Sequence, residues 1–310
     1  MTRRSLLPLA LMASFALTAG CADGLGGFLI SNQQEVELGV GVDQQLRYEY
    51  AIATPEDPAS VWASQLVGSL VPASVAFRDP AEIGGYKVAV IVDDGLVNAF
   101  AAPGGFTYIS TGLILQAQDC AEITGVLGHE LGHVTERHGV KQLEATYAVG
   151  IISEWFLGDG LATDVAQGVY GFLSSTQFSQ EHEAEADSVG LQIAFIAGYN
   201  PYGLTDFFLK LIALSNGAEV PTFLSSHPAT QDRVDDTTAE IEKRYGDNVN
   251  PGTTQTYGCL GTTLSLEQIK AHIQSGVAVL PGTGQGPPAE QPPQGATDTP
   301  SETPSETPGS

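Results

Sequence analysis

Hydrophobic and polar residues recur with helical spacing along most of this chain. Residues 31–50 open with Ser31 and Gln34, a capping-box pair, and the Glu, Gln and Leu residues of this segment suit an amphipathic helix. Similar patterns predict helices over residues 59–71, 121–137, 141–156, 161–173, 180–197, 201–214 and 229–245. The pattern therefore predicts a mainly helical fold.

Three shorter segments have the pattern of strands. Residues 86–92 alternate and are rich in Val and Ile, residues 97–101 form a short extended run, and residues 106–110 follow a Pro-Gly-Gly turn. These segments predict a small sheet. We therefore expect an α+β fold that is mainly helical.

One predicted helix carries the pentapeptide H-E-L-G-H at residues 129–133. Two imidazoles four residues apart lie about 40° from each other around a helix, so one cation can bind both. Zn²⁺ is the expected cation, and Glu130 is placed to move a proton from water to a leaving amine. The alternative is a buried helix whose two His are satisfied by hydrogen bonds. His138, about 180° round the same helix from His129, is predicted to point away from the metal.

A third ligand is expected from residues 180–190, which read Q-E-H-E-A-E-A-D-S-V-G. Glu183 and Asp187 share one helix face at the i, i+4 spacing. Glu183 is the candidate third ligand, and Asp187 is placed to accept a hydrogen bond from a liganding His. Glu181 and Glu185 are expected to be solvated, as acidic residues on helix surfaces usually are.

The order H-E-L-G-H and then E-A-E-A-D resembles the gluzincin metallopeptidases of the HtpX, BepA and Oma-type group, whose second motif is E-x-x-A-D. This resemblance covers roughly residues 31 to 245, with further similar blocks at residues 97–105, 111–113 and 227–234. It implies a zincin-like metallopeptidase domain with the small sheet beside the metal helix. It also implies one Zn²⁺ per chain, held by His129, His133 and Glu183, with Asp187 supporting a ligand.

The resemblance gives roles to two further parts of the chain. His227 and Arg233 fall in a block similar to the family's H-P block. His227 is then a candidate catalytic residue as an extra metal ligand, a latch or a stabiliser of the oxyanion, with a structural role as the alternative, and Arg233 is a candidate supporting residue. Asn98 and Ala99 lie on the strand expected to pair with the substrate backbone, unless that strand is simply part of the core.

The first residues have the pattern of an export signal. Arg3 and Arg4 precede a short apolar run, and L-T-A-G-C at residues 17–21 resembles a bacterial lipobox. Residues 1–20 are predicted to be a removed lipoprotein signal peptide, and Cys21 the site of lipid attachment. By the sorting rules of such lipoproteins an Asp after the Cys would favour the inner membrane, and Ala22 stands there. This favours the periplasmic face of the outer membrane over the inner membrane. The alternative is an ordinary signal peptidase site.

Cys120 and Cys259 are the other two of the 3 cysteines. Export to an oxidising compartment makes a disulfide between them possible, and two free buried thiols are the alternative.

Composition separates the predicted domain from a tail. Residues 281–310 are rich in Pro, Thr, Ser and Glu and lack Lys and Arg, so we expect a disordered tail after a single domain over residues 21–280. The 12 Lys and Arg against 36 Asp and Glu argue against nucleic acid as a partner.

The sequence therefore predicts a zinc metalloendopeptidase of the bacterial cell envelope, anchored to the membrane through Cys21. Its expected substrates are unfolded, misfolded or misassembled envelope proteins. The alternative is a zinc-stabilised, chaperone-like protein that binds assembling outer-membrane proteins and whose proteolysis is latent.

Overall fold

The structure is a computed structural model, which describes residues 29–147, 151–152, 155, 163–175, 177–215, 222–228, 230–246, 249 and 258–286. The predicted signal segment and Cys21 lie outside the described residues, as does the tail after Gly286.

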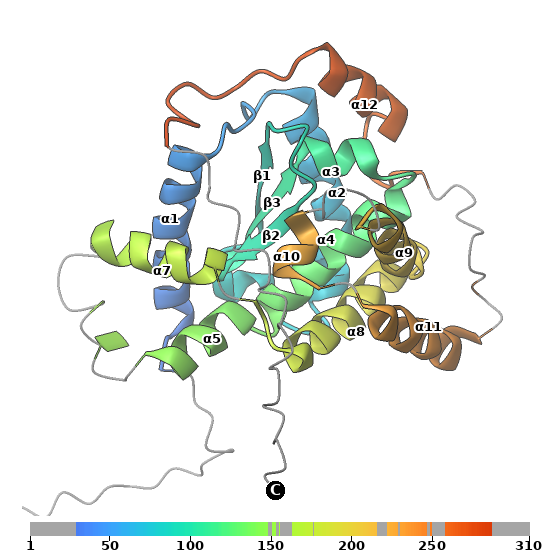
Figure 1. The fold of residues 1–310 in the computed structure, drawn as a ribbon, viewed down its shortest axis with the longest axis horizontal. Coiled ribbons are helices and arrows are strands. Elements are labelled where there is room, and N and C mark those ends of the chain that lie inside the picture. The colour runs from blue at the N-terminus through green and yellow to red at the C-terminus, as the bar shows by residue number, and fades with distance from the viewer. Residues whose placement is uncertain are drawn as a thin grey trace, which may run out of the picture.

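Helices make up most of the described chain (Figure 1). They are α1 (Asn32–Glu49), α2 (Pro58–Ser74), α3 (Thr111–Gln116), α4 (Cys120–Thr135), α5 (His138–Thr146), α7 (Thr163–Ser175), α8 (Gln180–Ile196), α9 (Gly203–Ser215), α10 (Thr222–Ser226), α11 (Gln231–Tyr245) and α12 (Leu266–Ser275), with short 3-10 turns η1 (Pro80–Ile83) and η2 (Pro103–Gly105). The predicted capping box of Ser31 and Gln34 opens α1. The first part of the predicted helix over residues 141–156 is the end of α5, whereas residues 148–150, 153–154 and 156 lie outside the described residues.

The described strands form one small sheet of β1 (Lys87–Ile91), β3 (Phe106–Ser110) and β2 (Ala99–Ala102), in that order. β1 runs parallel to β3, and β2 runs antiparallel to it, so β2 is an edge strand of this sheet. The prediction of a mainly helical α+β fold with a small sheet is confirmed.

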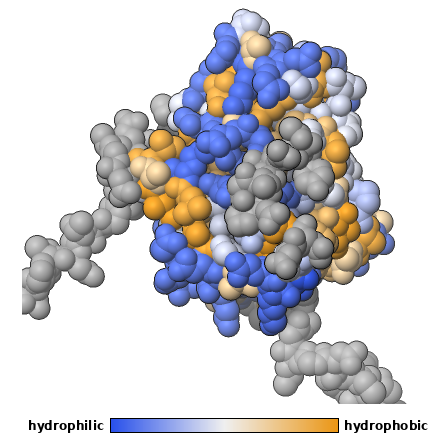
Figure 2. Space-filling model, turned by 90° about the vertical axis from the view of Figure 1, so that its right-hand side faces the viewer, coloured by the Kyte–Doolittle hydropathy of each residue, from blue (hydrophilic) through white to orange (hydrophobic). Residues whose placement is uncertain are grey.

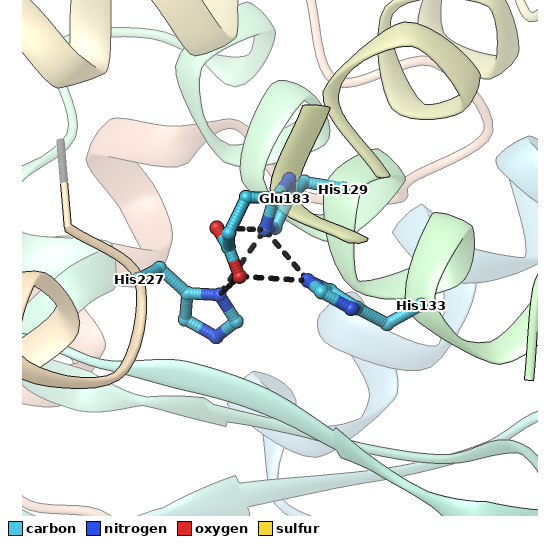
Figure 3. A group of neighbouring side chains, drawn as sticks. All are labelled: His129, His133, Glu183 and His227. Carbon is cyan, nitrogen blue, oxygen red and sulfur yellow. Dashed lines mark hydrogen bonds and ion pairs between the residues drawn. The ribbon is translucent and has the colours of Figure 1, made fainter. Parts of the chain in front are cut away.

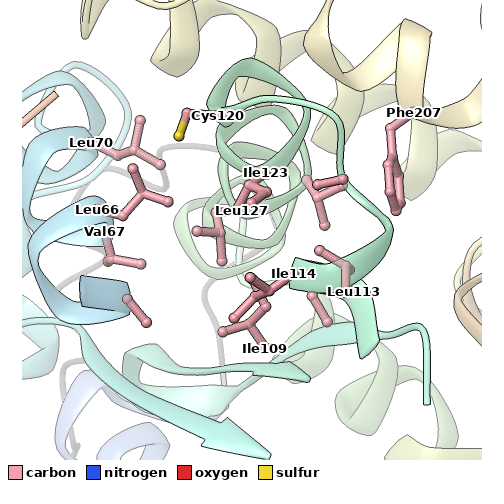
Figure 4. Packing of buried hydrophobic residues seen from close by; sticks show 14 of the residues in the cluster. Leu66, Val67, Leu70, Ile109, Leu113, Ile114, Cys120, Ile123, Leu127 and Phe207 are labelled. Carbon is pink, nitrogen blue, oxygen red and sulfur yellow. The ribbon is translucent and has the colours of Figure 1, made fainter. Parts of the chain in front are cut away.

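The alternation along the strands divides the core into two layers. Ala89 and Tyr108 face a cluster that includes Leu38 and Leu46 of α1, with α5 and α7 around it. Val90 and Ile109 face the opposite side of the sheet, where the larger cluster gathers α2, α3, α4 and α9. Figure 4 shows the second cluster, in which the labelled side chains of these helices meet above the sheet.

The crossing of α4 and α8 is very close because glycines form it. A Cβ added to Gly128 would lie 2.8 Å from the Gly190 carbonyl oxygen, and one added to Gly132 would lie 2.8 Å from that of Ala186. Only a glycine surface lets two helix backbones approach in this way, since any side chain would hold them apart. The crossing sets the helix of residues 129–133 against the helix that carries Glu183.

α4 ends in an unusual turn. Arg137 has φ 57° and ψ 34°, a left-handed conformation that is rare outside glycine, and α5 begins at the next residue. Its guanidinium donates to Glu35 at 2.8 Å and to the Ile30 carbonyl at 2.6 Å. This turn ends the predicted helix two residues before Arg137 and redirects the chain at His138.

The end of the described chain packs against its beginning. Leu280 donates to the Ile52 carbonyl, and Gly284 to that of Arg47. Cys259, ahead of α12, lies beside Cys120 at the start of α4, with Cα atoms 5.2 Å apart, a separation that suits a disulfide. Within the described residues, the helices are all too short or too polar to cross a bilayer.

Candidate metal centre

Three side chains from α4 and α8 converge at the crossing of these helices (Figure 3). Nε2 of His129 and Nε2 of His133 lie 3.0 Å apart. Glu183 places Oε2 at 3.5 Å from the first and Oε1 at 3.4 Å from the second. All three side chains are buried. The structure thus brings together the ligands that the sequence predicts.

The spacing of these donor atoms fits one zinc ion. Two donors at about 2.0–2.1 Å from a tetrahedral zinc are about 3.3 Å apart, close to the separations found between His129, His133 and Glu183. Burial keeps the pKa of His133 well below its ordinary value, so the ring has a lone pair to donate. Two imidazoles and a carboxylate are also a common ligand set of hydrolytic zinc.

Asp187 and Arg233 contact the candidate ligands on the side away from the point where the donor atoms meet. Oδ1 of Asp187 lies 2.8 Å from Nδ1 of His129. Arg233 of α11 donates to both oxygens of Asp187, at 2.8 and 2.7 Å, and its third nitrogen lies 2.8 Å from Oε2 of Glu183. Burial would raise the pKa of Asp187, but hydrogen bonds from His129 and Arg233 outweigh it and lower the pKa. Asp187 therefore stays an anion that can fix the tautomer of His129.

Glu130 lies beside the cluster and is outside the donor set. It is almost completely buried, and its Oε1 has no hydrogen-bond partner. Burial is the main cause of its raised pKa, which electrostatic interactions with the neighbouring imidazoles only partly offset. A buried carboxylate with a free oxygen and a raised pKa suits a group that accepts and then returns a proton.

His227, which directly follows α10, reaches into the same cluster. Its Nδ1 lies 2.9 Å from Oε1 of Glu183 and 3.2 Å from Nε2 of His129, and its Nε2 lies 3.5 Å from Oε1 of Glu130. Burial would lower its pKa, but the charges of Glu183 and Glu130 outweigh burial and raise it. His227 is thus close enough for each of the three site roles that the sequence leaves open.

The edge strand β2 runs next to α4, as the sequence predicts. Ala99 is fully buried and Asn98 partly so, and the backbone of Ala101 hydrogen-bonds Glu130. Just before β2, the Val97 carbonyl accepts a hydrogen bond of 3.0 Å from the N–H of Phe223 in α10. The segment that carries His227 therefore also contacts the residues just before β2.

One part of the site was missed by the sequence analysis. The prediction that His138 points away from the metal is wrong, because its Nδ1 lies 2.9 Å from Nδ1 of His133. Glu185 is exposed, as predicted, but one of its oxygens also accepts a hydrogen bond of 2.9 Å from Nε2 of His138, a contact that the sequence did not predict. The left-handed turn at Arg137 ends the helix early and reverses the expected direction of His138.

A comparison with protein families identifies the family of this chain. The model of peptidase family M48 matches residues 62–241, more than half of the chain. The chain belongs to peptidase family M48. All the candidate ligands, together with Glu130 and Arg233, fall inside the matched segment.

Several M48-type proteins are similar to parts of this chain. The beta-barrel assembly-enhancing protease of Yersinia pestis is 27% identical over 68% of this chain and 44% of its own length. Metalloprotease LoiP of Escherichia coli is 34% identical over 48% of this chain and 59% of its own length. The mitochondrial metalloendopeptidase OMA1 of Arabidopsis thaliana is 31% identical over 46% of this chain and 29% of its own length. The matched part thus spans about half, or less, of most of these relatives.

Family M48 and the names of these relatives agree on the class of enzyme. The prediction of the family is confirmed, and a metallopeptidase that uses zinc is what this family and the names of the relatives indicate. The mainly helical fold, with its small sheet and its cluster of candidate ligands, is compatible with the predicted zincin-like domain.

Proposed function

We propose that this chain is a zinc-dependent endopeptidase of the bacterial cell envelope. The observation that carries the proposal is the convergence of His129, His133 and Glu183 on one point, with the buried carboxylate of Glu130 beside it. Bound zinc would polarise the scissile carbonyl and lower the pKa of a water molecule.

The chain's own groups account for the other requirements of peptide hydrolysis. Glu130 takes a proton from the attacking water and returns it to the departing amine, and its raised pKa makes both transfers feasible. Asp187 and Arg233 hold His129 and Glu183 in position. The edge strand, with Asn98 and Ala99, is proposed to pair with the main chain of an extended substrate, which gives affinity without strong sequence preference.

The proposed substrates are misfolded or misassembled envelope proteins. The name of the Yersinia pestis relative, a protease that enhances beta-barrel assembly, supports this class. We further propose that residues 1–20 are a removed signal peptide and that Cys21 carries a lipid anchor on the periplasmic face of the outer membrane. The predicted boundary between domain and tail at residue 280 is too early, because Thr283 and Gly284 hydrogen-bond to Ile52 and Arg47. We therefore propose that the peptidase domain extends from residue 21 to residue 286 and that the residues after Gly286 form the tail. The L-T-A-G-C pattern at residues 17–21 supports the anchor.

A second candidate function is a chaperone-like protein with latent proteolysis. It is favoured by His227, which fills the space next to Glu130 and Glu183, and by the bond between Phe223 and Val97 at the edge strand. Replacement His227→Ala separates the roles of this residue. If His227 is a latch, casein cleavage rises in the variant; if it is a ligand or an oxyanion stabiliser, cleavage falls.

The decisive experiment compares the wild type with Glu130→Gln in a casein cleavage assay, with and without a zinc chelator. We expect the variant to keep its zinc and to lose a factor of about 10² to 10⁴ in turnover, because the proton carrier is gone. Glu181→Gln, an exposed acidic residue of α8, is the matched control and should cleave normally. Normal cleavage by Glu130→Gln, or cleavage that is insensitive to the chelator, would refute the proposal.

A further inference from the structure

His133 and His129 differ in what holds their outer nitrogen. Asp187 lies directly against Nδ1 of His129, at 2.8 Å. Nδ1 of His133 meets a second imidazole, that of His138, at 2.9 Å, and only beyond this ring comes a carboxylate, Glu185, at 2.9 Å from Nε2 of His138.

The carboxylate of Glu185 determines where each proton lies in this series of hydrogen bonds. An ionised carboxylate only accepts hydrogen bonds, so Nε2 of His138 carries the proton that faces Glu185. In a neutral imidazole the other nitrogen is then an acceptor, and Nδ1 of His138 accepts the proton on Nδ1 of His133. This leaves Nε2 of His133 with a lone pair, and that atom faces His129 and Glu183. The opposite arrangement would place a proton on Nε2 of His133 and prevent ligation.

We propose that Glu185 and His138 form a two-step relay that fixes the tautomer and orientation of His133, as Asp187 does in one step for His129. The proposal rests on the metal centre proposed above and deepens it, by naming two positioning residues that neither the motifs nor the relatives assign.

Burial and contacts with neighbouring side chains hold His138 in the orientation that this role requires. The ring is completely buried, and both of its nitrogens have partners. His182 stacks on it with ring centroids 4.4 Å apart, and Phe178 stacks on His133 at 4.1 Å. Lys141 lies 3.5 Å from the Glu185 oxygen that His138 bonds, which favours the ionised carboxylate. These contacts fix the planes of both rings.

The turn at Arg137 positions His138 beside His133. A continuous α4 would carry residue 138 to the far side of the helix, whereas the left-handed backbone of Arg137 starts α5 at His138 and turns its ring toward His133. The ion pair between Arg137 and Glu35 stabilises that turn.

The test measures zinc affinity and needs no cleavage assay. The purified whole chain is titrated with zinc against a chromophoric chelator, and the Co²⁺-substituted protein is followed by its visible absorption spectrum. The variants are His138→Leu, His138→Asn and Glu185→Ala. Glu181→Ala removes an equal charge from the exposed part of α8 and is the matched control.

We expect His138→Leu to weaken zinc binding by about 10- to 100-fold and to change the Co²⁺ spectrum, as the loss of a group that supports a ligand usually does. Glu185→Ala should weaken binding in the same direction. His138→Asn should recover most of the affinity, because its side-chain oxygen replaces Nδ1 as the acceptor. Glu181→Ala should bind zinc as the wild type does.

Two results would overturn the relay. One is wild-type affinity in both His138→Leu and Glu185→Ala, and the other is an equal loss in Glu181→Ala and Glu185→Ala, which would reveal a general charge effect. Because Glu185 is half exposed, Glu185→Ala decides the question even if His138→Leu does not fold. A wild-type chain that binds no zinc would refute the proposed function itself, so the two failures are distinguishable.

Discussion

Each imidazole of the proposed metal centre has a partner beyond the other ligands, and the chemical type of this partner differs from ring to ring. Asp187 supports His129, and His138 supports His133, while His227 lies between the two carboxylates of Glu183 and Glu130. The negative charges of these two carboxylates stabilise the protonated ring and outweigh burial, so the pKa of His227 is raised. Its protonation therefore depends on whether another cation occupies the cluster.

Arg233 gives the first prediction at the scale of single residues. It makes three charge-assisted contacts with Asp187 and Glu183, and a lysine has no planar fork with which to make them together. We expect Arg233→Lys to weaken zinc binding by about tenfold or more. Chelator competition measures the change. Arg244→Lys, on the same helix but in an exposed pair with Glu240, is the control and should leave affinity unchanged; an equal loss in both would contradict the prediction.

Sequence reasoning recovers the part of the site that depends on local spacing. His129 and His133, and likewise Glu183 and Asp187, are four residues apart on helices, and such pairs share a face wherever the helix lies. His138 could not be placed in this way. Its position depends on a left-handed Arg137 that is held by Glu35, which lies 102 residues earlier in the chain.

At the scale of elements, the crossing of α4 and α8 decides whether the ligands meet. A Cβ on Gly190 would lie 2.6 Å from the backbone nitrogen of His129, closer than any side chain can approach without moving one helix. We expect Gly190→Ala to destabilise the protein by about 1–3 kcal/mol, since overpacking forces backbone shifts, and to weaken zinc binding as well. Urea unfolding and zinc titration measure the two effects.

Gly68 of α2 provides the control for this prediction. A Cβ there would meet nothing within 4 Å, so Gly68→Ala should stabilise the protein by about 0.5–1 kcal/mol through helix propensity alone. If Gly190→Ala is as well tolerated as Gly68→Ala, the close crossing is not needed to build the site.

The strands, like the helices, could be predicted from the local pattern of residues. Their order in the sheet could not. The alternation in residues 86–92 and the Pro-Gly-Gly turn before residues 106–110 predict strands but contain no information on pairing. β1 pairs in parallel with β3, β2 lies at an edge, and α4 packs against β2. These are contacts between separate segments, which the pattern within one segment does not contain. The short helices α3 and α10 lacked a long enough pattern to be predicted.

At the scale of the whole molecule, stability depends on the net charge and on the contacts of the last described segment. With 36 Asp and Glu against 12 Lys and Arg, the chain repels itself, and the face in Figure 2 shows hydrophilic residues over much of the surface with hydrophobic groups between them. Contacts that tie the last described segment to the first therefore have a large repulsion to offset.

Cys120 and Cys259 join the start of α4 to the segment ahead of α12, and we propose that they form a disulfide. The two cysteines are separated by 139 residues, so a covalent link between them restricts the unfolded chain strongly. We expect Cys259→Ser to lower the free energy of unfolding by about 2–4 kcal/mol. Reductant should lower the midpoint of urea unfolding of the wild type and leave that of the variant unchanged. Two alkylated thiols in the unreduced wild type would disprove the disulfide.

Asp57 joins α2 to α12 and to the segment after it, and its ionisation makes the stability of the whole molecule depend on pH. The carboxylate caps α2 through the N–H of Ala59 at 2.8 Å, and it also accepts from the N–H of Ala278 at 2.9 Å and from Nε2 of His272 at 2.9 Å. Burial would raise its pKa, but the hydrogen bonds from Ala278, Ala59 and His272 outweigh burial and lower it.

A lowered pKa means that the native state binds this proton less tightly than the unfolded chain does. The stabilisation by Asp57 is therefore complete above the ordinary pKa of an aspartate, near 4, and is lost as the pH falls through the lower native value. We expect Asp57→Asn to cost about 1–3 kcal/mol at pH 7, and its deficit relative to the wild type should shrink at pH values below about 4. Asp79→Asn is the control, because Asp79 caps only the exposed turn η1 through Ala81. Urea unfolding at both pH values decides the matter: a deficit in Asp57→Asn that stays constant with pH would show that shape, and not the charge of this carboxylate, joins α2 to the segment after α12.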